Sequence, residues 1–223
     1  MEDSDLLISK LNAKPINFDY PLHGIELYVP DAEAVRNWYE LQLSTNPTAR
    51  FPFWAKLWPS SIALAEYIIE NDSFIAGKKV LEIAGGLGLP SLAAAASARE
   101  VIFTDVDHAA VSLFSKLISI NKKTNLTAFT LDWNSFPAGL SADVLLLSDV
   151  NYDDASFQSL HSLIHTFLDK GLLVLLSTPM RLIGRPFIEP LLSLALDHQV
   201  KSVAFSGTDS MITILALKRS IPV

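Results

Sequence analysis

The fold is decided by the stretch Lys79–Pro90, which reads KVLEIAGGLGLP. Its first half is an apolar run of strand length. Its end begins a helix, because Pro90 fits the first helical turn, where N–H groups have no intrahelical partners. The glycines between them permit a tight turn and let a ligand approach main-chain N–H groups without a Cβ in the way. The pattern predicts a strand–turn–helix unit, and a turn that serves close packing alone is the simpler alternative.

Working outward, six more apolar runs have strand length, and helix-like segments separate most of them. The runs are Val101–Thr104, Ala128–Leu131, Val144–Leu147, Leu172–Ser177, Val200–Phe205 and Ile212–Leu217. Strands that alternate with helices predict parallel βαβ units. Only residues 206–210, rich in Gly, Asp and Ser, separate the last two runs, and five residues suit a hairpin loop and cannot hold a crossover helix. We therefore predict a Rossmann-like α/β fold, with a seven-stranded, mostly parallel sheet, helices on both faces and a C-terminal antiparallel hairpin.

Helical spacing of apolar residues indicates where the helices lie. The expected segments are Ser91–Ala98, Ala109–Asn121, Asp154–Lys170 and Pro186–His198 within the sheet region, and Asp31–Leu41 and Ile62–Glu70 before it. Asp31 is a plausible N-cap of its helix. We expect residues 1–74 to form an N-terminal helical extension that covers the ligand site, and residues 75–223 to form the main domain.

Composition excludes several function classes. The chain has 223 residues, 17 Lys plus Arg, 24 Asp plus Glu and a formal net charge of −7, which argues against nucleic acid as the main partner. There is no cysteine, which excludes disulfides, thiolate zinc sites and cysteine nucleophiles. No window of about 20 apolar residues indicates a membrane span. His161 and His165 have the i, i+4 spacing of zinc ligands, but no third ligand is evident, and we expect no metal. The acidic N-terminus does not resemble a secretory signal, and we expect a cytoplasmic protein.

An acidic residue, Asp105, closes the strand that follows the glycine turn. In a wound sheet the carboxyl ends of neighbouring strands form the ligand crevice, and an acid there can accept both hydroxyls of a ribose. Turn and acid together imply an adenosine-containing cofactor. The alternative is that Asp105 only caps the following helix, although Asp107 is the better cap. Glu82, just before the glycines, suits the cationic groups of S-adenosylmethionine better than a dinucleotide pyrophosphate.

Several motifs in order resemble the class I, seven-stranded S-adenosylmethionine-dependent methyltransferases. More narrowly, they are similar to the lysine methyltransferase group with an Asp-x-x-Tyr motif, also described as nicotinamide N-methyltransferase-like. The resemblance runs from Phe51 to Arg219. It rests on Val80–Pro90, Asp105, Leu131-Asp132-Trp133, Asp149-Val150-Asn151-Tyr152 and the stretch Phe53–Ser60.

The resemblance assigns the cofactor turn to Glu82, Gly86 and Gly88, with Ala84 where the first glycine of the motif usually stands. The backbone at Ala84 must then be compatible with a Cβ, for which Gly85 beside it is a possible compensation. Asp105 matches the ribose-binding acid of the family.

Three further positions match cofactor contacts. Asp132 corresponds to an acceptor for the adenine amine, and Trp133 to a ring that packs on adenine. Trp58 matches an aromatic residue that covers the cofactor from the N-terminal side. For each of them an ordinary structural role, as a strand-end acid or a packing tryptophan, is the alternative.

The resemblance places the transfer site at Asp149, Asn151 and Tyr152, after the strand Ala142–Ser148. Polar groups at such a strand end are costly unless they are used or solvated. Asp149 could hold an amine and Tyr152 could stabilise a cation through its ring. A solvated polar loop is the alternative. Arg181 and Arg185 follow another strand end, where they could face an acidic substrate or lie in a solvated loop.

The sequence thus predicts an S-adenosylmethionine-dependent N-methyltransferase that acts on a protein lysine side chain. Methylation of a small-molecule nitrogen or oxygen is the first alternative. A non-catalytic adaptor with the same fold is the second, and a nucleotide-dependent oxidoreductase the third. The substrate, the number of methyl groups transferred and the oligomeric state stay open.

Overall fold

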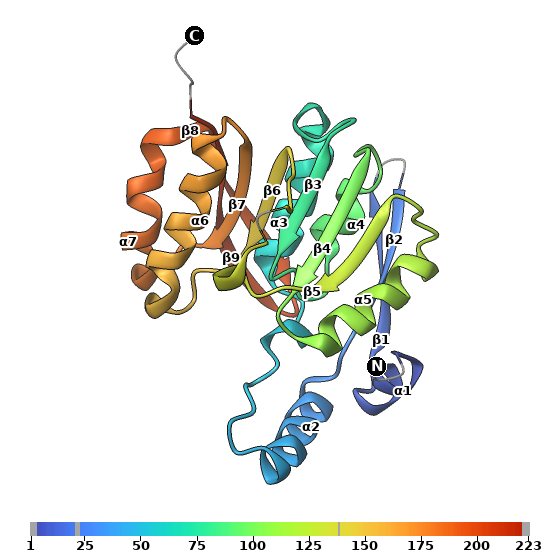
Figure 1. The fold of residues 1–223 in the computed structure, drawn as a ribbon. Coiled ribbons are helices and arrows are strands. Elements are labelled where there is room, and N and C mark those ends of the chain that lie inside the picture. Colours follow the sequence, from blue (N-terminus) through green and yellow to red (C-terminus); the bar gives the residue numbers. More distant parts are fainter. Residues whose placement is uncertain (1–3, 21–22, 138, 220–223) are drawn as a thin grey trace.

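The computed structural model describes residues 4–20, 23–137 and 139–219, and its centre is a seven-stranded sheet in the order β5-β4-β3-β6-β7-β9-β8 (Figure 1). Neighbours from β5 to β7 pair in parallel, and β9 pairs antiparallel with both β7 and β8. The predicted mostly parallel sheet is confirmed. The strands are β3 (Lys79–Ile83), β4 (Glu100–Asp105), β5 (Leu126–Thr130), β6 (Val144–Ser148), β7 (Leu173–Pro179), β8 (Ala195–Phe205) and β9 (Thr208–Leu217).

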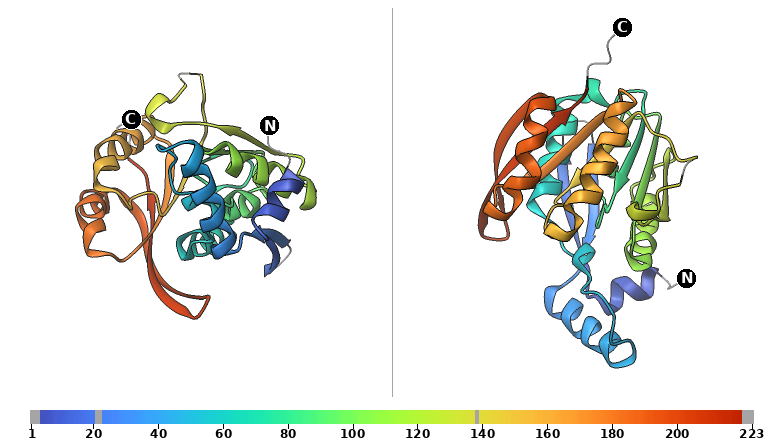
Figure 2. Two further views of the ribbon diagram at one scale, coloured as in Figure 1. Left: turned by 90° about the horizontal axis from the view of Figure 1, so that it is seen from below. Right: turned by 60° about the vertical axis from the view of Figure 1, so that its left-hand side comes forward.

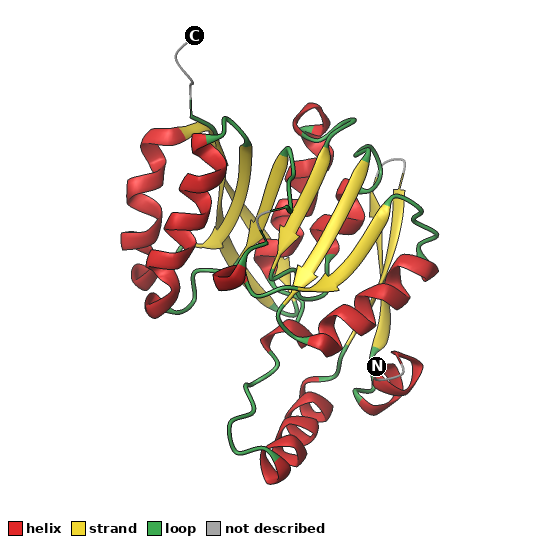
Figure 3. Ribbon diagram, in the orientation of Figure 1, coloured by secondary structure: helices red, strands yellow, loops and turns green. Residues whose placement is uncertain are grey.

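Helices cover both faces of the sheet (Figure 3). One apolar cluster joins the sheet to α3 (Pro59–Glu70), α4 (Leu89–Ala94) and α5 (His108–Ile120), and another joins it to α6 (Phe157–Asp169) and α7 (Arg185–Ile188). Because side chains alternate along a strand, Val80 faces the first cluster and Leu81 the second, and both are fully buried. This two-sided burial explains why the strands read as continuous apolar runs.

The chain between β7 and the end differs from the prediction in two details. The expected helix Pro186–His198 ends earlier, because α7 passes into a 3-10 helix, Glu189–Leu194, and Ala195 already begins β8. The expected five-residue hairpin loop is a two-residue turn of Ser206 and Gly207, with φ of +51° and +74°. Two positive φ values match the right-handed twist of the strands, which is why this turn closes so tightly.

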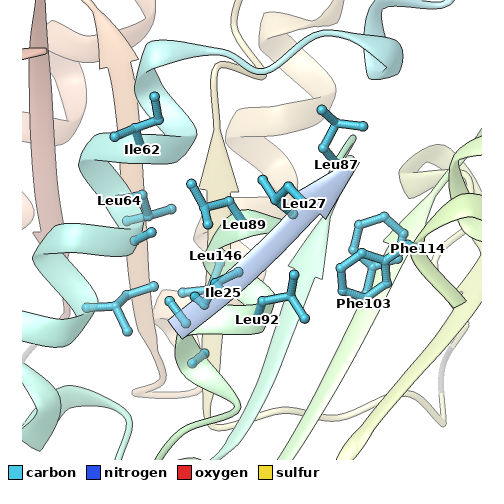
Figure 4. Close-up of a cluster of buried hydrophobic side chains, with 14 of the residues drawn as sticks. Ile25, Leu27, Ile62, Leu64, Leu87, Leu89, Leu92, Phe103, Phe114 and Leu146 are labelled. Carbon is cyan, nitrogen blue, oxygen red and sulfur yellow. The ribbon is translucent and has the colours of Figure 1, made fainter. Parts of the chain in front are cut away.

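The N-terminal segment is not only helical. Besides α1 (Ser4–Lys10) and α2 (Ala32–Thr45) it contains an antiparallel hairpin of β1 (Lys14–Tyr20) and β2 (His23–Val29). Ile25 and Leu27 of β2 pack over Leu89 and Leu92 at α4 (Figure 4). All four side chains are buried, so the hairpin forms an outer layer on the helices and belongs to the same core.

The predicted N-cap of α2 is confirmed, since the Asp31 side chain accepts hydrogen bonds from the N–H groups of Glu33 and Ala34. This helix lies beyond the carboxyl ends of the parallel strands in both views (Figures 1 and 2). The chain returns from it through the short 3-10 helix Phe53–Ala55 to α3. Among the described residues, no helix is long and apolar enough to cross a membrane.

Candidate active site

The turn after β3 requires glycine at two positions for packing. A Cβ on Gly85 would stand 2.3 Å from the ring of Phe103, and one on Gly88 would stand 2.0 Å from the ring of Phe114. These two rings stack with centroids 3.8 Å apart beneath the turn. Gly86 and Gly88 also have φ of +57° and +72°, which glycine adopts without strain. Close packing, the simpler alternative interpretation of this turn, therefore explains part of the motif.

Ala84, which replaces the first glycine of the motif, has a strained backbone conformation. Its φ is +52°, a left-handed conformation that costs an alanine about 1–2 kcal/mol. Gly85 beside it does not take over the left-handed turn, since its φ is not positive. The sequence requires a backbone at Ala84 that suits a Cβ, but the structure has a left-handed conformation there instead. Strain of this kind clusters at ligand-binding turns.

Glu82 lies fully buried below the turn. Its Oε2 accepts hydrogen bonds from the N–H and the hydroxyl of Ser91, in the first turn of α4. Oε1 is buried and has no hydrogen-bond partner among the described residues. Burial raises the pKa of Glu82 to about 8, although the Ser91 hydrogen bonds oppose this rise. A buried carboxylate oxygen without a donor is unusual and indicates a place for a polar or cationic ligand group.

Asp105 ends β4 beside this turn and is 5% exposed. Its Oδ2 accepts a hydrogen bond of 3.0 Å from the N–H of Gly86, and Oδ1 one of 2.9 Å from the N–H of Asp107. Burial raises its pKa to about 6, against the effect of these N–H donors. Each oxygen keeps capacity for another donor, as a ribose hydroxyl would provide. The cap of α5 is Asp107, whose side chain accepts from the N–H of Ala109, as the sequence favoured.

At the end of β5, Asp132 and Trp133 lie beside the same edge. Asp132 is exposed and accepts hydrogen bonds from the N–H and the side-chain amide of Asn134. Trp133 is half-buried, and its Nε1 has no acceptor among the described residues. A hollow of about 840 Å³ opens next to it, between the β5–β6 connection and α6. Trp133 lines this hollow and also lies just after the end of β5. Glu82 and Asp105 do not line the hollow.

The segment before α3 carries two tryptophans, and Trp54 is the one shown to contact the turn. Trp58 is half-buried, donates its Nε1–H to the carbonyl of Phe53, and has the amine of Lys56 4.3 Å from its ring centroid. Trp54, which the sequence analysis did not single out, is closer to the glycines. A Cβ on Gly86 would meet its carbonyl oxygen at 3.4 Å. The buried ring of Trp54 donates to Asp107, which anchors the segment to the N-terminus of α5.

The three residues expected at the transfer site have different surroundings. Asp149 is 7% exposed and has a φ of +53°, so the chain turns sharply at the end of β6 as it does at Ala84 on β3. Asn151 is buried and accepts a hydrogen bond of 2.7 Å from the Thr178 hydroxyl, which ties the ends of β6 and β7 together. Tyr152 is 51% exposed and its ring lies 5.6 Å from that of Phe53.

Aromatic rings continue from Tyr152 to α2. Phe53 lies 5.1 Å from Phe51, which lies 5.1 Å from Tyr39 on α2. Phe51 and Phe53 are 40% and 49% exposed. Only the aromatic composition of residues 51–54 could have indicated this row, because its members meet through the tertiary fold. It borders the site with surface suited to an apolar or cationic partner.

These residues fit S-adenosylmethionine. Glu82 Oε1 is a buried acceptor without a donor, Gly86 offers a turn without a Cβ, and Asp105 presents a carboxylate at the neighbouring strand end. The cofactor carries an ammonium group and a ribose, which are donors for such acceptors. Within the described ranges 4–20, 23–137 and 139–219 there is no group of three His, Asp or Glu residues that could hold a metal ion.

Comparisons with known proteins agree with this geometry. The sequence model of a family described as "Lysine methyltransferase" matches residues 40–188. The electron transfer flavoprotein beta subunit lysine methyltransferase of Mus musculus is 32% identical over 140 residues, 60% of this chain and 52% of that protein. Histone-arginine methyltransferase METTL23 of Homo sapiens is 28% identical over 121 residues, 52% of this chain and 64% of that protein. The chain spans about half the length of the first curated relatives it matches.

A solved structure shares the fold. The N-methyltransferase NodS from Bradyrhizobium japonicum WM9, in complex with S-adenosyl-L-homocysteine, superimposes with a TM-score of 0.53 at 15% identity, covering 81% of this chain and 98% of that one. At this identity the likeness speaks for the fold alone. Since the family match covers most of the chain and includes the turn and the ends of β4, β5 and β6, this chain belongs to the S-adenosylmethionine-dependent lysine methyltransferase family.

Proposed function

We propose that this protein transfers a methyl group from S-adenosylmethionine to the side-chain amine of a lysine in a protein. The observation that carries the proposal is Asp149. Its carboxylate is buried at the end of β6, next to the glycine turn of β3, and its Oδ1 has no hydrogen-bond partner among the described residues. An amine is the donor that such an oxygen lacks. The names of the relatives support a protein substrate, and those of the flavoprotein methyltransferases support lysine.

The cofactor would be held by the residues at the strand ends. We assign its ammonium group to Glu82, its ribose to Asp105, and its adenine to Asp132 and Trp133. We assign the close approach of the main chain to Gly86, while Gly88 lets the turn pack on Phe114 and Ala84 shapes the turn. Trp58 covers the cofactor from the extension. When bound, the cofactor supplies a methyl group on a cationic sulfur.

The chain's own part in the transfer is to align a neutral amine. Alignment of reacting groups is worth several kcal/mol, out of about 7–11 for well-oriented reactions. We assign the amine to Asp149 Oδ1 and to the ring of Tyr152, while Asn151 holds the strand end in place through Thr178. The amine would lose its proton to solvent first, so that its lone pair could accept the methyl group while the electron pair of the carbon–sulfur bond passes to sulfur.

We further propose that residues 1–74 act as the covering extension and 75–223 as the catalytic domain. Trp54 and Phe53 support this division, because they bring the extension to Gly86 and Tyr152. The cytoplasm is the compartment we propose, and the absence of cysteine permits a reducing environment. Cell fractionation with an antibody to this protein tests the compartment.

The experiment is a transfer assay with a radiolabelled methyl donor. The probes are recombinant electron transfer flavoprotein beta subunit, a dialysed cell lysate and the low-molecular-weight fraction removed by dialysis. We expect label in protein, on lysine after hydrolysis, and at least about a hundredfold slower transfer by Asp149→Asn, as for loss of a positioned transition-state group. The matched control is Asp143→Asn, an exposed aspartate that precedes β6 at its opposite end. Label confined to the small-molecule fraction would establish the alternative substrate class. Tight cofactor binding without transfer to any pool would favour the adaptor.

A further inference from the structure

A second charged residue faces the proposed amine site. Arg181, in the loop after β7, places its Nη2 3.3 Å from Asp149 Oδ2. The side chain of Arg181 is 39% exposed, whereas that of Asp149 is 6% exposed. The arginine therefore reaches from the surface onto a buried acid. It contacts one carboxylate oxygen, Oδ2, and leaves the buried Oδ1 without a hydrogen-bond partner among the described residues.

Two cations from different parts of the chain act on Asp149. Burial raises the pKa of Asp149, and Arg181 and then Lys56 of the segment before α3 oppose this rise. Asp149 in turn acts on Tyr152, and burial raises the pKa of that phenol, so it stays neutral at physiological pH. Arg181 is the cation in direct contact with the carboxylate, so it has the strongest influence on its charge.

A lone buried carboxylate would be a poor partner for the reaction proposed above. It would favour the protonated amine, which has no lone pair for attack. When the acid is paired with arginine, the pair has no net charge and does not favour the protonated amine. The carboxylate can still accept a hydrogen bond. The arginine contact of 3.3 Å is made to Oδ2 alone, so the pair holds the acid without using its second oxygen, Oδ1.

We propose that Arg181 is a positioning residue for methyl transfer: it neutralises Asp149 and fixes Oδ2, so that Oδ1 accepts a hydrogen bond from an uncharged target amine. This inference rests on the proposed function. It assigns a role to a residue outside the turn and the Asp-x-x-Tyr motif. It also predicts a specific signature, because loss of Arg181 should impair deprotonation of the bound amine rather than its binding.

The kinetic test compares Arg181→Gln and Arg181→Lys with the wild-type protein, with recombinant electron transfer flavoprotein beta subunit or the lysate protein that accepts label as substrate. For Arg181→Gln we expect a lower kcat at pH 7.5, an unchanged or lower KM, and an ascending limb of the kcat–pH profile that moves up by about one pH unit or more. Arg181→Lys should restore most of the profile. The matched control is Arg99→Gln, because Arg99 also pairs with an aspartate, Asp143, but at the amino ends of the strands.

A second measurement needs no substrate. In protein labelled with ¹³C-carboxyl aspartate, the resonance that disappears in Asp149→Asn reports the titration of Asp149. We expect its midpoint to move to higher pH in Arg181→Gln and to return in Arg181→Lys, with S-adenosylhomocysteine affinity unchanged. An unmoved midpoint, or a loss of activity equal at all pH values with a raised KM, would overturn the inference. If the wild-type protein labels no protein at all, the proposed function fails, and the titration still decides whether Arg181 controls the charge of Asp149.

Discussion

The N–H of Gly86, in the turn after β3, donates its hydrogen bond to the carboxylate of Asp105 at the end of β4. The glycine turn and the acid that follows the next strand are therefore one unit. The turn orients the acid, and the acid in turn satisfies an N–H group that would otherwise be without a partner. Two motifs separated by a helix in the sequence are therefore in direct contact at the strand ends.

We expect cofactor affinity to depend on the charge of Asp105. Burial raises its pKa to about 6, so the carboxylate is ionised at neutral pH and becomes protonated below about pH 6. The protonated form is a weaker acceptor for hydroxyl groups, and the affinity for S-adenosylhomocysteine should fall there by up to about tenfold per pH unit. Calorimetric titration between pH 5 and 8 measures this. Asp105→Asn should bind weakly throughout and should lose the part of the pH dependence that centres on about pH 6, while the part due to Glu82 near pH 8 stays. A wild-type profile with no change around pH 6 would contradict the assignment.

Glu82 should make the free protein less stable as the pH rises. Its pKa is about 8 in the folded protein and near the ordinary 4.5 in the unfolded chain, so the folded state holds this proton more tightly. The stabilisation is complete below about pH 4.5 and is lost as the pH rises to about 8. Urea midpoints at pH 5, 7 and 8.5 measure the loss. We expect Glu82→Gln to lack this component, and a wild-type stability that increases from pH 5 to 8.5 would argue against it.

Cofactor binding should release a proton from Glu82. At pH 7 the acid is mostly protonated, because its pKa is about 8. A cationic ammonium group beside it favours the carboxylate, so binding should release up to about one proton per molecule bound. Calorimetry of the wild-type protein in phosphate and in Tris buffer measures the released protons from the difference in apparent enthalpy. Equal proton release by Glu82→Gln would show that another group titrates.

Gly88→Ala should destabilise the fold. The added methyl group would overlap the ring of Phe114 and would sit on a backbone with a φ of +72°. Overpacking of this kind costs about 1–3 kcal/mol, and a left-handed alanine adds about 1–2 kcal/mol. Urea unfolding measures the change. Gly24→Ala is the matched control, since nothing lies within 4 Å of its added Cβ and its φ is not positive. Equal stability of the two variants would contradict the packing at the turn.

Ala84→Gly should change the free energy of unfolding in the opposite direction from Gly88→Ala. Glycine removes the cost of about 1–2 kcal/mol of a left-handed alanine and adds about 0.5–1 kcal/mol of chain entropy, so the free energy of unfolding should rise slightly. The control is Ala63→Gly in the middle of α3, which should cost at least about 1 kcal/mol. Thermal unfolding separates the two, and a comparable loss in both would mean that Ala84 is not strained.

The sequence predicts the inner strands β3, β4, β6 and β7 well because nearly all of their residues are buried, whereas the edge strands β5 and β8 are largely exposed. The hairpin of β1 and β2 was missed, although Ile16, Phe18, Ile25 and Leu27 alternate with polar residues as strands do. The polar composition of this segment obscured that alternation. Alternation with a period of two residues is the signal that indicates these strands.

The candidate site is only partly readable from the sequence. The strand-end acids can be located because topology alone brings them to one edge. The contact between Arg181 and Asp149 and the approach of Trp54 to Gly86 cannot, because they join residues 32 positions apart in each case and depend on how loops close over the edge. The left-handed backbone of Asp149 likewise has no signature in residue type.

The hairpin of β2 has a consequence for how this chain can be shortened. The family match begins at residue 40, yet Leu7, Leu11, Ile25 and Leu27 are at most 1% exposed. A fragment that begins at residue 40 would leave Leu89 and Leu92 uncovered and would expose a hydrophobic surface on α4. The β2 hairpin therefore covers part of the hydrophobic core. A deletion variant without it is expected to aggregate, so its loss of activity would not report on catalysis.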